Sequence, residues 1–564
     1  MRKMPLPGRC VAPALMVLAA LLLWANPADA DLQVWTVAET RRVLRTDKPG
    51  KTRDVDLAAA GREWESFQIL LRSDAPVEGI TIQPGDLEGP DGSVLRAEDA
   101  RLFRQHQLHI RTGSHRNESF QPGWYPDALI PFTHPLTRAP LDEARFDAVP
   151  FRLPAGETHG FLVDVRVPAN VAAGEYRGTY MIKAKGHQTV QVPVRLTVWD
   201  FDLPRVSTMV AQLGWPANRM RRYYRNLAKK GKTREPADWS AIETQCSAML
   251  TRHRINCWPP DRLRPQPSGE QFVIPKDQID TFRRYVDRYH VNAYRVPRPP
   301  VDDPEAQHEK LEKWMESWDR AAKELNRPQV LFYMYLTDEP NDEEEYEFVQ
   351  RWGRAIRKCN SVVQVMVTEQ TWPQKKEWGD LYGAIDIWCP LYCLFKPDSA
   401  AKRREKGESL WTYTALCQGS KTTPWWQTDF PLLHYRVPAW ISWRYRIRGQ
   451  LYWGGMAYWR GVEDPWTDPD TYHESLTFNG EGMLVYPGHA AGYEGIAPSL
   501  RLKAFRDGLE DYEYMAILER AGLAEEAEQV VRRLAASWYE WEKDPEAYRK
   551  TRAKLARMIT EAVN

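Results

Sequence analysis

The feature that most constrains the fold is a repeated alternation of short apolar runs with amphipathic helical stretches between residues 208 and 460. Eight runs have strand-like composition, at residues 209–215, 255–258, 293–296, 330–336, 362–368, 384–389, 409–414 and 450–459. Helical periodicity marks residues 239–253, 277–290, 304–325 and 343–358, and shorter helical stretches, including 436–448, separate the later runs. Eight strand–helix units in about 250 residues are what a (β/α)8 TIM barrel requires. A doubly wound sheet is the alternative, but no glycine-rich phosphate loop follows the first run, so the barrel is favoured.

The segments on either side of this repeat have different patterns. Before it, short alternating strands separated by Gly, Pro and Asp indicate a β-sandwich, with strands expected at 32–37, 66–71, 160–167, 178–184 and 190–198. After it, a strand is expected at 482–487 and helices at 499–521, 524–542 and 545–563. The predicted fold is therefore multidomain: an N-terminal β-sandwich (31–205), a central (β/α)8 TIM barrel (206–465), and a C-terminal strand and helical subdomain (466–564) packed against the barrel without chemistry of its own.

The first thirty residues are typical of a cleavable signal peptide. Arg2, Lys3 and Arg9 form a basic region, residues 11–25 are apolar, and Ala-Asp-Ala at 28–30 supplies the small residues before a cleavage site. The apolar run is too short to be a membrane anchor, and no later segment has eighteen uninterrupted apolar residues. We therefore expect a secreted or periplasmic protein without a membrane span.

The composition narrows the class of partner. The chain has 77 basic and 76 acidic residues, and removing the signal peptide leaves 74 and 75. This balance argues against a nucleic-acid or anionic-membrane partner, since either favours a basic protein. The 24 Trp and 25 Tyr are mostly ordinary core residues, but aromatic faces also stack on the C–H faces of sugars. The expected partner is a glycan or glycoconjugate.

The sequence predicts no metal and no cofactor. After signal cleavage six cysteines remain, at 246, 257, 359, 389, 393 and 417, far fewer than in a disulfide scaffold. One or two bridges after export, or buried free thiols, are both compatible with this number. His106 and His109 are three residues apart, but no further ligand pair accompanies them, and we interpret them as surface histidines.

The candidate catalytic residues follow the fourth strand of the expected barrel. The run 330–336 ends in Thr337, Asp338, Glu339 and Pro340. TIM-barrel active sites gather at the C-terminal ends of the strands, and Pro340 would hold the two acids on a stiff turn. The alternative is that Asp338 belongs to a helix N-cap, with residues 341–343 in the first turn.

Adjacency limits what these two carboxylates can do. Conventional glycosidases hold two carboxyls about 5–9.5 Å apart across the scissile bond, usually on different strands. Neighbours on one strand end point in divergent directions, so Glu339 is the candidate general acid/base while Asp338 holds a group of the substrate. If that group is a 2-acetamido substituent, its carbonyl oxygen can attack the anomeric carbon, and the protein needs no nucleophile of its own.

Several motifs resemble glycoside hydrolase family 123 and its relatives, including the domain of unknown function 4091. They are AGEYRG at 173–178, VWDFDLP at 198–204, YLTDEP at 335–340, LWTYT at 410–414, GQLYWG at 449–454, PSLR at 498–501 and RDGLEDYEY at 506–514. The resemblance covers nearly the whole mature chain and is specific to the broad family rather than to one substrate.

The resemblance implies β-N-acetylgalactosaminidase activity by substrate-assisted retention. It assigns Asp338 to orienting the acetamido group and Glu339 to acid/base catalysis. Tyr413 is a candidate donor to the acetamido carbonyl, and Trp453 and Trp459 are candidate walls for the sugar, with barrel packing as the alternative for the aromatics. The family pattern continues after the tyrosine with a cysteine and Gly-Pro, whereas this chain reads ALCQGS at 415–420, which leaves the exact sugar open.

Two other readings remain at this stage. One is a glycosidase of the same fold acting on a sugar without a 2-acetamido group, with Asp386 or Glu369 as a third, nucleophilic carboxylate. The other is a non-catalytic carbohydrate-binding protein that keeps the barrel, against which the Asp338–Glu339 pair counts.

Overall fold

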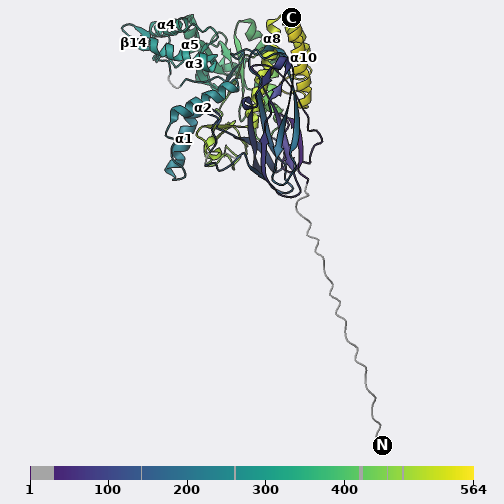
Figure 1. Cartoon of the computed structure of the whole chain (residues 1–564). Coiled ribbons are helices and arrows are strands. Elements are labelled where there is room, and N and C mark those ends of the chain that lie inside the picture. Colours follow the sequence, from purple (N-terminus) through teal and green to yellow (C-terminus); the bar gives the residue numbers. More distant parts are fainter. Residues whose placement is uncertain are drawn as a thin grey trace.

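The computed structural model describes Met1 and residues 31–141, 143–259, 262–417, 423–453, 455–472 and 476–563. The predicted signal peptide therefore lies outside the described residues, apart from Met1. The chain forms a two-sheet N-terminal part, a barrel-like parallel sheet with its helices, and C-terminal helices that lie beside the two sheets (Figure 1).

The N-terminal part is built from two sheets that enclose one apolar core. The first sheet is antiparallel, in the spatial order β1 (Gln33–Ala38), β3 (Trp64–Arg72), β10 (His159–Arg166), β7 (Arg101–Ile110) and β8 (Gly123–Pro131). The second has the order β2 (Val55–Gly61), β12 (Val190–Asp202), β11 (Gly174–Lys183), β4 (Val77–Gln83) and β9 (Phe151–Leu153), with the short β5 (Leu87–Glu88) and β6 (Val94–Leu95) at its side. Only β2 and β12 pair in parallel among these described strands. Alternate side chains of both sheets meet in the core, as in a sandwich.

The barrel-like sheet contains seven parallel strands within the described residues. Its order is β13 (Val210–Gln212), β21 (Gly449–Tyr452), β20 (Ser409–Thr414), β19 (Ile387–Trp388), β18 (Gln364–Thr368), β17 (Leu331–Asp338) and β16 (Ala293–Arg295). The helices between them are α1 (Pro216–Lys229), α2 (Trp239–Arg252), α3 (Lys276–Tyr289), α4 (His308–Leu325), α5 (Glu343–Lys358), α6 (Pro397–Glu405) and α7 (Leu433–Arg444). The hairpin β14 (Gln266–Ser268) and β15 (Gln271–Val273) lies between α2 and α3. The last predicted strand is shorter than expected, since β21 ends at Tyr452.

The predicted second strand of the barrel is wrong, and this is why the sheet is nearly closed rather than closed. Residues 255–258 form no strand; two prolines follow directly, and proline has no N–H to give to a ladder. Asn256 spans the gap instead: its backbone N–H donates to the Ala211 carbonyl (2.9 Å) and its Nδ2 donates to the Ala293 carbonyl (2.8 Å). The backbone N–H and the side-chain amide of Asn256 together therefore connect β13 to β16 where a strand was expected.

The predicted helices 239–253, 277–290, 304–325 and 343–358 lie on α2 to α5 with only their ends shifted. Helix α1 has no counterpart among the predictions, although its buried residues, including Ala217, Met220, Tyr224 and Leu227, have helical spacing. His106 and His109 are partly buried rather than surface residues. His106 Nε2 lies 2.7 Å from the Trp466 carbonyl, and His109 stacks on Trp124 with ring centroids 4.6 Å apart.

The C-terminal helices contact both the barrel and the sandwich. After the small hairpin of β22 (Val485–Pro487) and β23 (Ile496–Pro498) come α8 (Leu500–Arg520), α9 (Ala524–Val531) and α10 (Pro545–Val563). The middle helix ends at Val531, well before the predicted 542. Helix α8 is buried along almost all of its length, packing against α7 on one side and β8 on the other. It follows the last barrel strand, so it occupies the place of the eighth helix of the repeat. The boundaries expected at 205 and 465 stay predictions.

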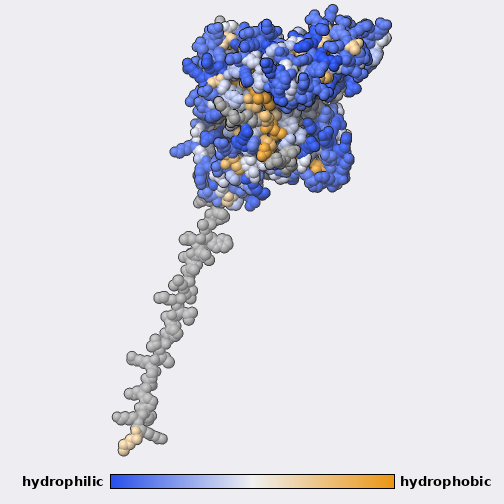
Figure 2. Space-filling model, turned by 180° about the vertical axis from the view of Figure 1, so that it is seen from behind, coloured by the Kyte–Doolittle hydropathy of each residue, from blue (hydrophilic) through white to orange (hydrophobic). Residues whose placement is uncertain are grey.

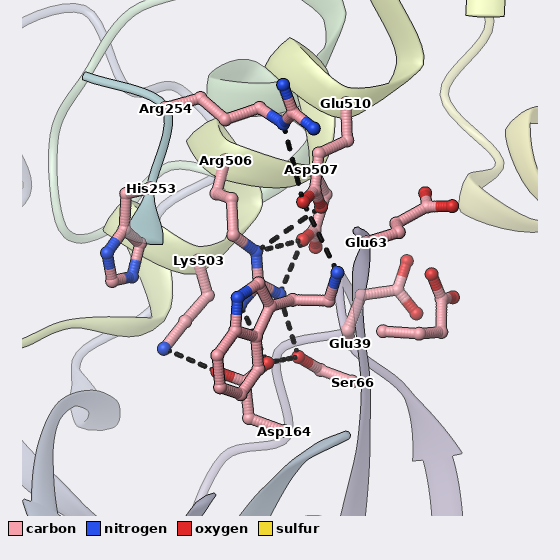
Figure 3. A network of polar contacts seen from close by, with 12 residues as sticks. Glu39, Glu63, Ser66, Asp164, His253, Arg254, Lys503, Arg506, Asp507 and Glu510 are labelled. Atoms are coloured by element: carbon pink, nitrogen blue, oxygen red, sulfur yellow. Dashed lines mark hydrogen bonds and ion pairs between the residues drawn. The ribbon is translucent and has the colours of Figure 1, made fainter. Parts of the chain in front are cut away.

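A buried polar network joins α8 to the sandwich (Figure 3). Asp164 on β10 accepts from Lys503 Nζ and Arg506 Nη1, each at 2.7 Å, and from the Ser66 hydroxyl at 2.7 Å. Burial raises the pKa of Asp164, but the charges of Arg506 and Lys503 outweigh it and hold the pKa below its ordinary value. Because each charge is paired and hydrogen-bonded, the network fixes how the sandwich sits on α8.

The surface of the molecule is mostly polar. Seen from behind, it carries an apolar strip in a hollow between polar flanks (Figure 2). Within the described part of the chain, no helix has the length and apolarity needed to cross a bilayer.

Candidate active site

The Asp338–Glu339 pair lies at the C-terminal end of β17, and both side chains are exposed to solvent. Asp338 is the last residue of the strand and Glu339 has a φ of +45°, in the left-handed region that few non-glycine residues adopt. The alternative role for Asp338 as a helix cap does not apply, because Asp342 is the N-cap of α5: its Oδ1 accepts from the Glu345 N–H at 2.8 Å. Asp338 is therefore available for a substrate.

Asp338 is held by two hydroxyl groups. Tyr335 on the same strand donates to Oδ1, and Thr368, the last residue of β18, donates to the same oxygen at 2.9 Å. Thr368 Oγ1 also accepts from the Glu339 N–H at 3.0 Å. Thr368 thus ties the side chain of one acid to the backbone of the other.

The contact between Tyr335 and Asp338 depends on an irregularity in β17. On a regular strand, residues three apart point to opposite faces. The register of β17 against β18 shifts between Tyr335 and Thr337, as in a β-bulge, and this re-aims the side chains beyond it. Sequence reasoning missed Tyr335 and Thr368 because the bulge and the pairing of β17 with β18 are tertiary features.

Glu339 is paired with Tyr413 from β20. The Tyr413 hydroxyl donates to Glu339 Oε1, and the tyrosine itself is only 3% exposed. Burial, and then the charge of Glu339, raises the pKa of Tyr413 far above its ordinary value, so Tyr413 is a neutral donor at any working pH. The structure therefore brings together three of the five residues predicted for the site: Asp338, Glu339 and Tyr413.

A third carboxyl, Glu369, lies behind the turn that carries Glu339. Its carboxylate accepts from the Tyr346 hydroxyl (3.1 Å) and from Gln374 Nε2 (3.1 Å), and Gln374 Nε2 also contacts the Pro340 carbonyl (3.2 Å). Burial raises the pKa of Glu369 to about 7, with a smaller contribution from the charge of Glu339. Gln374 and Glu369 thus brace the Glu339–Pro340 turn from behind, and the Glu369 side chain is only 3% exposed.

Asp386 lies at the opposite end of the barrel. It directly precedes β19, its carboxylate accepts from the Val365 N–H near the start of β18 (2.8 Å), and it pairs with Arg357 (3.1 Å). The C-terminal strand ends carry Asp338 and Glu339, so Asp386 is at the wrong end to reach a sugar held there. Neither alternative nucleophile has the placement that a conventional double displacement needs.

The two predicted tryptophan walls have different surroundings. Trp453 directly follows β21 and is half-buried; its Nε1 donates to Glu481 Oε1 at 2.5 Å. Trp459 is 5% exposed, donates to the Val485 carbonyl at 3.1 Å and packs edge-on against Tyr223. Trp459 thus has core-like packing, whereas Trp453 lies at the C-terminal end of the parallel sheet, beside the end of β20.

Glu481 is a buried carboxyl that the sequence did not single out. Besides Trp453, the Tyr452 hydroxyl donates to it at 3.0 Å, and Gln427 Nε2 donates to its other oxygen. Burial raises the pKa of Glu481 to about 7. Gly480 and Gly482, both with positive φ, flank it and allow the turn that inserts it beneath β21. Among the described residues, no group of three or more His, Cys, Asp or Glu side chains has the arrangement of a metal site.

Part of the chain matches a known family. Residues 305–518, from the segment before α4 to the end of α8, match the model described as "Glycoside hydrolase 123, catalytic domain". No curated protein sequence matches the chain.

Solved structures show the same likeness at the level of the fold. A family 123 glycoside hydrolase from Clostridium perfringens, studied for glycolipid glycan hydrolysis, has a TM-score of 0.64 at 13% identity, covering 94% of this chain and 97% of that one. A GH5 xyloglucanase from Bacteroides ovatus has a TM-score of 0.26 at 8% identity, covering 85% and 100%. A β-glucuronidase from Bacteroides uniformis has a TM-score of 0.23 at 12% identity, covering 75% and 45%. The TM-scores of the xyloglucanase and the β-glucuronidase are too low to support a conclusion about the fold or function of this chain.

Proposed function

Since the chain carries the catalytic domain of glycoside hydrolase family 123 and is a glycoside hydrolase, we propose that it removes β-linked N-acetylgalactosamine, or more broadly β-N-acetylhexosamine, by substrate-assisted retaining hydrolysis. The observation that carries the proposal is the adjacent pair of carboxylates with separate partners. The Asp338 side chain is held by Tyr335 and Thr368, whereas the Glu339 side chain accepts a hydrogen bond from the Tyr413 hydroxyl on another strand.

In this mechanism the substrate supplies the nucleophile. Glu339 gives its proton to the glycosidic oxygen as the bond from that oxygen to the anomeric carbon breaks. Asp338 accepts a hydrogen bond from the acetamido N–H, so the acetamido carbonyl oxygen is directed at the anomeric carbon and closes an oxazolinium ring that keeps its N–H and whose positive charge the Asp338 carboxylate stabilises. Water then opens the ring while Glu339 takes a proton from it, and the sugar leaves with its original anomeric configuration.

The partners of the two acids fit these two roles. An orienting group must not move, and the hydroxyl groups of Tyr335 and Thr368 hold the Asp338 carboxylate in place. An acid/base must exchange a proton, and Glu339 is solvent-exposed on a turn beyond the strand. Tyr413 can move its hydrogen bond from Glu339 to the acetamido carbonyl when a sugar is bound, which is the role expected for it.

A panel of aryl β-glycosides tests the sugar. We expect hydrolysis of the N-acetylgalactosamine glycoside, with N-acetylglucosamine second, and inhibition by a thiazoline that mimics the cyclised intermediate. Hydrolysis confined to sugars without an acetamido group would contradict the proposal. The glycan of a glycolipid is one natural substrate to include, since the Clostridium perfringens protein of similar fold was studied on that class.

Variants of the two acids test their roles separately. Glu339→Gln should lower kcat about 10²–10⁴-fold on poor leaving groups and much less on a dinitrophenyl glycoside, which needs no proton to depart. Asp338→Asn should slow both substrates, because cyclisation is impaired whatever the leaving group. Glu343→Gln, on the exposed first turn of α5, is the matched control and should leave turnover unchanged. Equal losses on both leaving groups for Glu339→Gln would refute its role as the acid.

Glu369→Gln separates this mechanism from a conventional one. If Glu369 were the nucleophile, its amide would abolish turnover. Because its carboxylate faces Tyr346 and Gln374, we expect the variant to retain at least about a tenth of the activity, with a shifted pH profile.

We also propose that the protein is exported. The support is the sequence of residues 1–30 alone. Cell fractionation followed by N-terminal sequencing should find the mature protein outside the cytoplasm and beginning at Asp31. Full-length protein retained with the cytoplasmic fraction would contradict export.

A further inference from the structure

A strongly basic segment stands out in a chain whose overall charge is balanced. Residues 216–234, which include α1, contain eight cations and no acidic residue: Arg219, Arg221, Arg222, Arg225, Lys229, Lys230, Lys232 and Arg234. A run of like charges is usually a solvated face, and by itself it identifies no ligand. The side chains and the hollow around α1 give the further observations that point to a ligand.

One side of this segment lines a hollow of about 310 Å³. The opposite wall is the loop 457–463 that follows the last barrel strand, and it contributes Trp459 and Arg460. The wall is fixed: the Tyr223 hydroxyl donates to the Glu463 carbonyl at 2.7 Å, and the Tyr223 ring packs edge-on against Trp459 with centroids 5.1 Å apart. The hollow is therefore a built feature between two braced elements.

The cations around the hollow outnumber the carboxylates. Its lining contains Arg219, Arg222, Lys229, Lys230 and Arg460, and the only acid in that lining is Glu463. Glu463 already pairs with Lys230 and Lys232. Within the part of the chain that the structure describes, Arg219, Arg222 and Arg460 form no ion pair, because the nearby Glu463 pairs with the two lysines.

The three arginines also repel one another. The pKa of Arg219 is lowered by partial burial and further by the charges of Arg222 and Arg460. Placing like charges together without a carboxylate costs free energy, and an anion bound among them would recover it. Guanidinium groups are suited to this because their planar donors match carboxylate and sulfate oxygens.

The hollow is built from elements that leave the sheet at the same end as the catalytic pair. Helix α1 begins just beyond the C-terminal end of β13, and the opposite loop follows β21. These strands are parallel to β17, so both elements emerge at the end of the sheet where Asp338 and Glu339 lie. The Arg219 guanidinium lies over the Tyr458 ring at 5.2 Å, and that ring packs against Trp453 with centroids 5.0 Å apart. A chain of contacts through Tyr458 thus links Trp453 to Arg219 in the lining of the hollow.

We propose that the hollow between α1 and the loop 457–463 is a subsite for an anionic group of the glycan, a carboxylate or a sulfate ester on a sugar beyond the one that is cleaved. Arg219, Arg222 and Arg460 bind the anion, and Trp459 and Tyr223 brace the wall. Anion binding follows from these residues alone, whereas its use in catalysis rests on the proposed function.

Matched substrates test the subsite kinetically. Three disaccharides are compared, each with a terminal β-N-acetylgalactosamine. The second sugar is glucose in the neutral substrate, glucuronic acid in the carboxylate substrate and 6-sulfated glucose in the sulfate substrate, so the three differ only at C6 of that sugar. We expect a lower KM for the anionic substrates at low salt, and loss of the advantage as ionic strength rises. Arg222→Gln should raise KM for the anionic substrates about fivefold and the double variant with Arg219→Gln about twentyfold, with kcat and the neutral substrate unchanged.

Arg225→Gln is the control, because Arg225 is an exposed cation of the same helix that does not line the hollow. Equal effects of Arg225→Gln and Arg222→Gln would overturn the proposal, since general attraction by a basic helix predicts them. Circular dichroism and thermal unfolding check that each variant is folded.

Direct binding distinguishes failure of the subsite from failure of the proposed function. Methyl glucuronide and inorganic sulfate, titrated into the full chain by calorimetry, should bind to the native protein and to Arg225→Gln, but more weakly to the double variant. If no disaccharide is hydrolysed yet this pattern holds, the proposed sugar is wrong and the subsite stands. If the neutral disaccharide is hydrolysed but neither anion is preferred or bound, the subsite is wrong and the function stands. Binding to phosphatidylserine vesicles that depends on Arg222, with no preference for anionic disaccharides, would assign the surface to a membrane and overturn the proposal.

Discussion

Thr368 makes the sharpest test of the site, because one hydroxyl connects both acids. It donates to Asp338 Oδ1 at 2.9 Å and accepts from the Glu339 N–H at 3.0 Å. Thr368→Val keeps the shape of the side chain, and its β-branched form suits a strand, while it removes both hydrogen bonds. The change therefore loosens the two acids without deleting either.

The expected loss follows from these two bonds. A hydrogen bond to a charged group is worth about 1.5–3 kcal/mol, and the lower figure applies because Asp338 is exposed and keeps the Tyr335 hydroxyl. The contact to the Glu339 N–H adds about 0.5 kcal/mol, since water can replace it. The sum of about 2 kcal/mol predicts a fall of roughly 30-fold in kcat.

Steady-state kinetics on an aryl β-N-acetylgalactosaminide measure this loss, with KM expected to change little. Thr412→Val is the matched control. Thr412 is buried beside Tyr413, and its hydroxyl donates to the Pro390 carbonyl at 2.8 Å without touching either acid. It should cost about 1 kcal/mol of stability and leave kcat within about threefold. If Thr368→Val is as active as Thr412→Val, Thr368 does not position the pair.

Three further predictions concern other parts of the molecule. Asn256→Ala should lower the free energy of unfolding by about 2–3 kcal/mol in urea denaturation, because the lost side-chain amide leaves the buried Gln212 Oε1 on β13 and the Ala293 carbonyl on β16 without their donor. A loss below about 1 kcal/mol would show that the gap needs no side-chain bridge. Burial raises the pKa of Glu481 from 4.5 to about 7, so the stability that the protonated carboxyl contributes is complete below about pH 4.5 and is lost as the pH rises to about 7. In thermal melts, the stability of Glu481→Gln relative to the wild type should therefore increase across that pH range. Parallel curves of melting temperature against pH would contradict this. A hydrogen bond from Cys393 lowers the pKa of the exposed Cys417 to about 6, so iodoacetamide at pH 7 should label Cys417 before any other cysteine. Cys393→Ser should shift the labelling of Cys417 to higher pH. Preferential labelling of the buried Cys389 would refute the assignment.

Local sequence patterns determined the elements of this chain. The alternation of apolar runs and amphipathic helices located seven strands of the parallel sheet and helices α2 to α5, because side-chain periodicity reflects which face of an element is buried. The same logic located Asp338 and Glu339, since their position after a buried strand is a local property. The overall composition did not reveal the basic segment at α1, because a balanced total charge can include a segment whose charges are all positive.

Only the tertiary structure decided which residues serve the catalytic pair. Tyr335 reaches Asp338 because β17 carries a bulge, and Thr368 meets both acids because β18 pairs with β17 in that register. Asn256 replaces a strand through contacts with Ala211 and Ala293, which are distant in sequence. Each of these depends on how separate segments pack, and a hydrogen bond between such segments leaves no periodic trace in the sequence. The sequence by itself determined where the two acids are. The packing of neighbouring strands decided which side chains hold each acid, and therefore which of the two can orient a substrate group and which can exchange a proton.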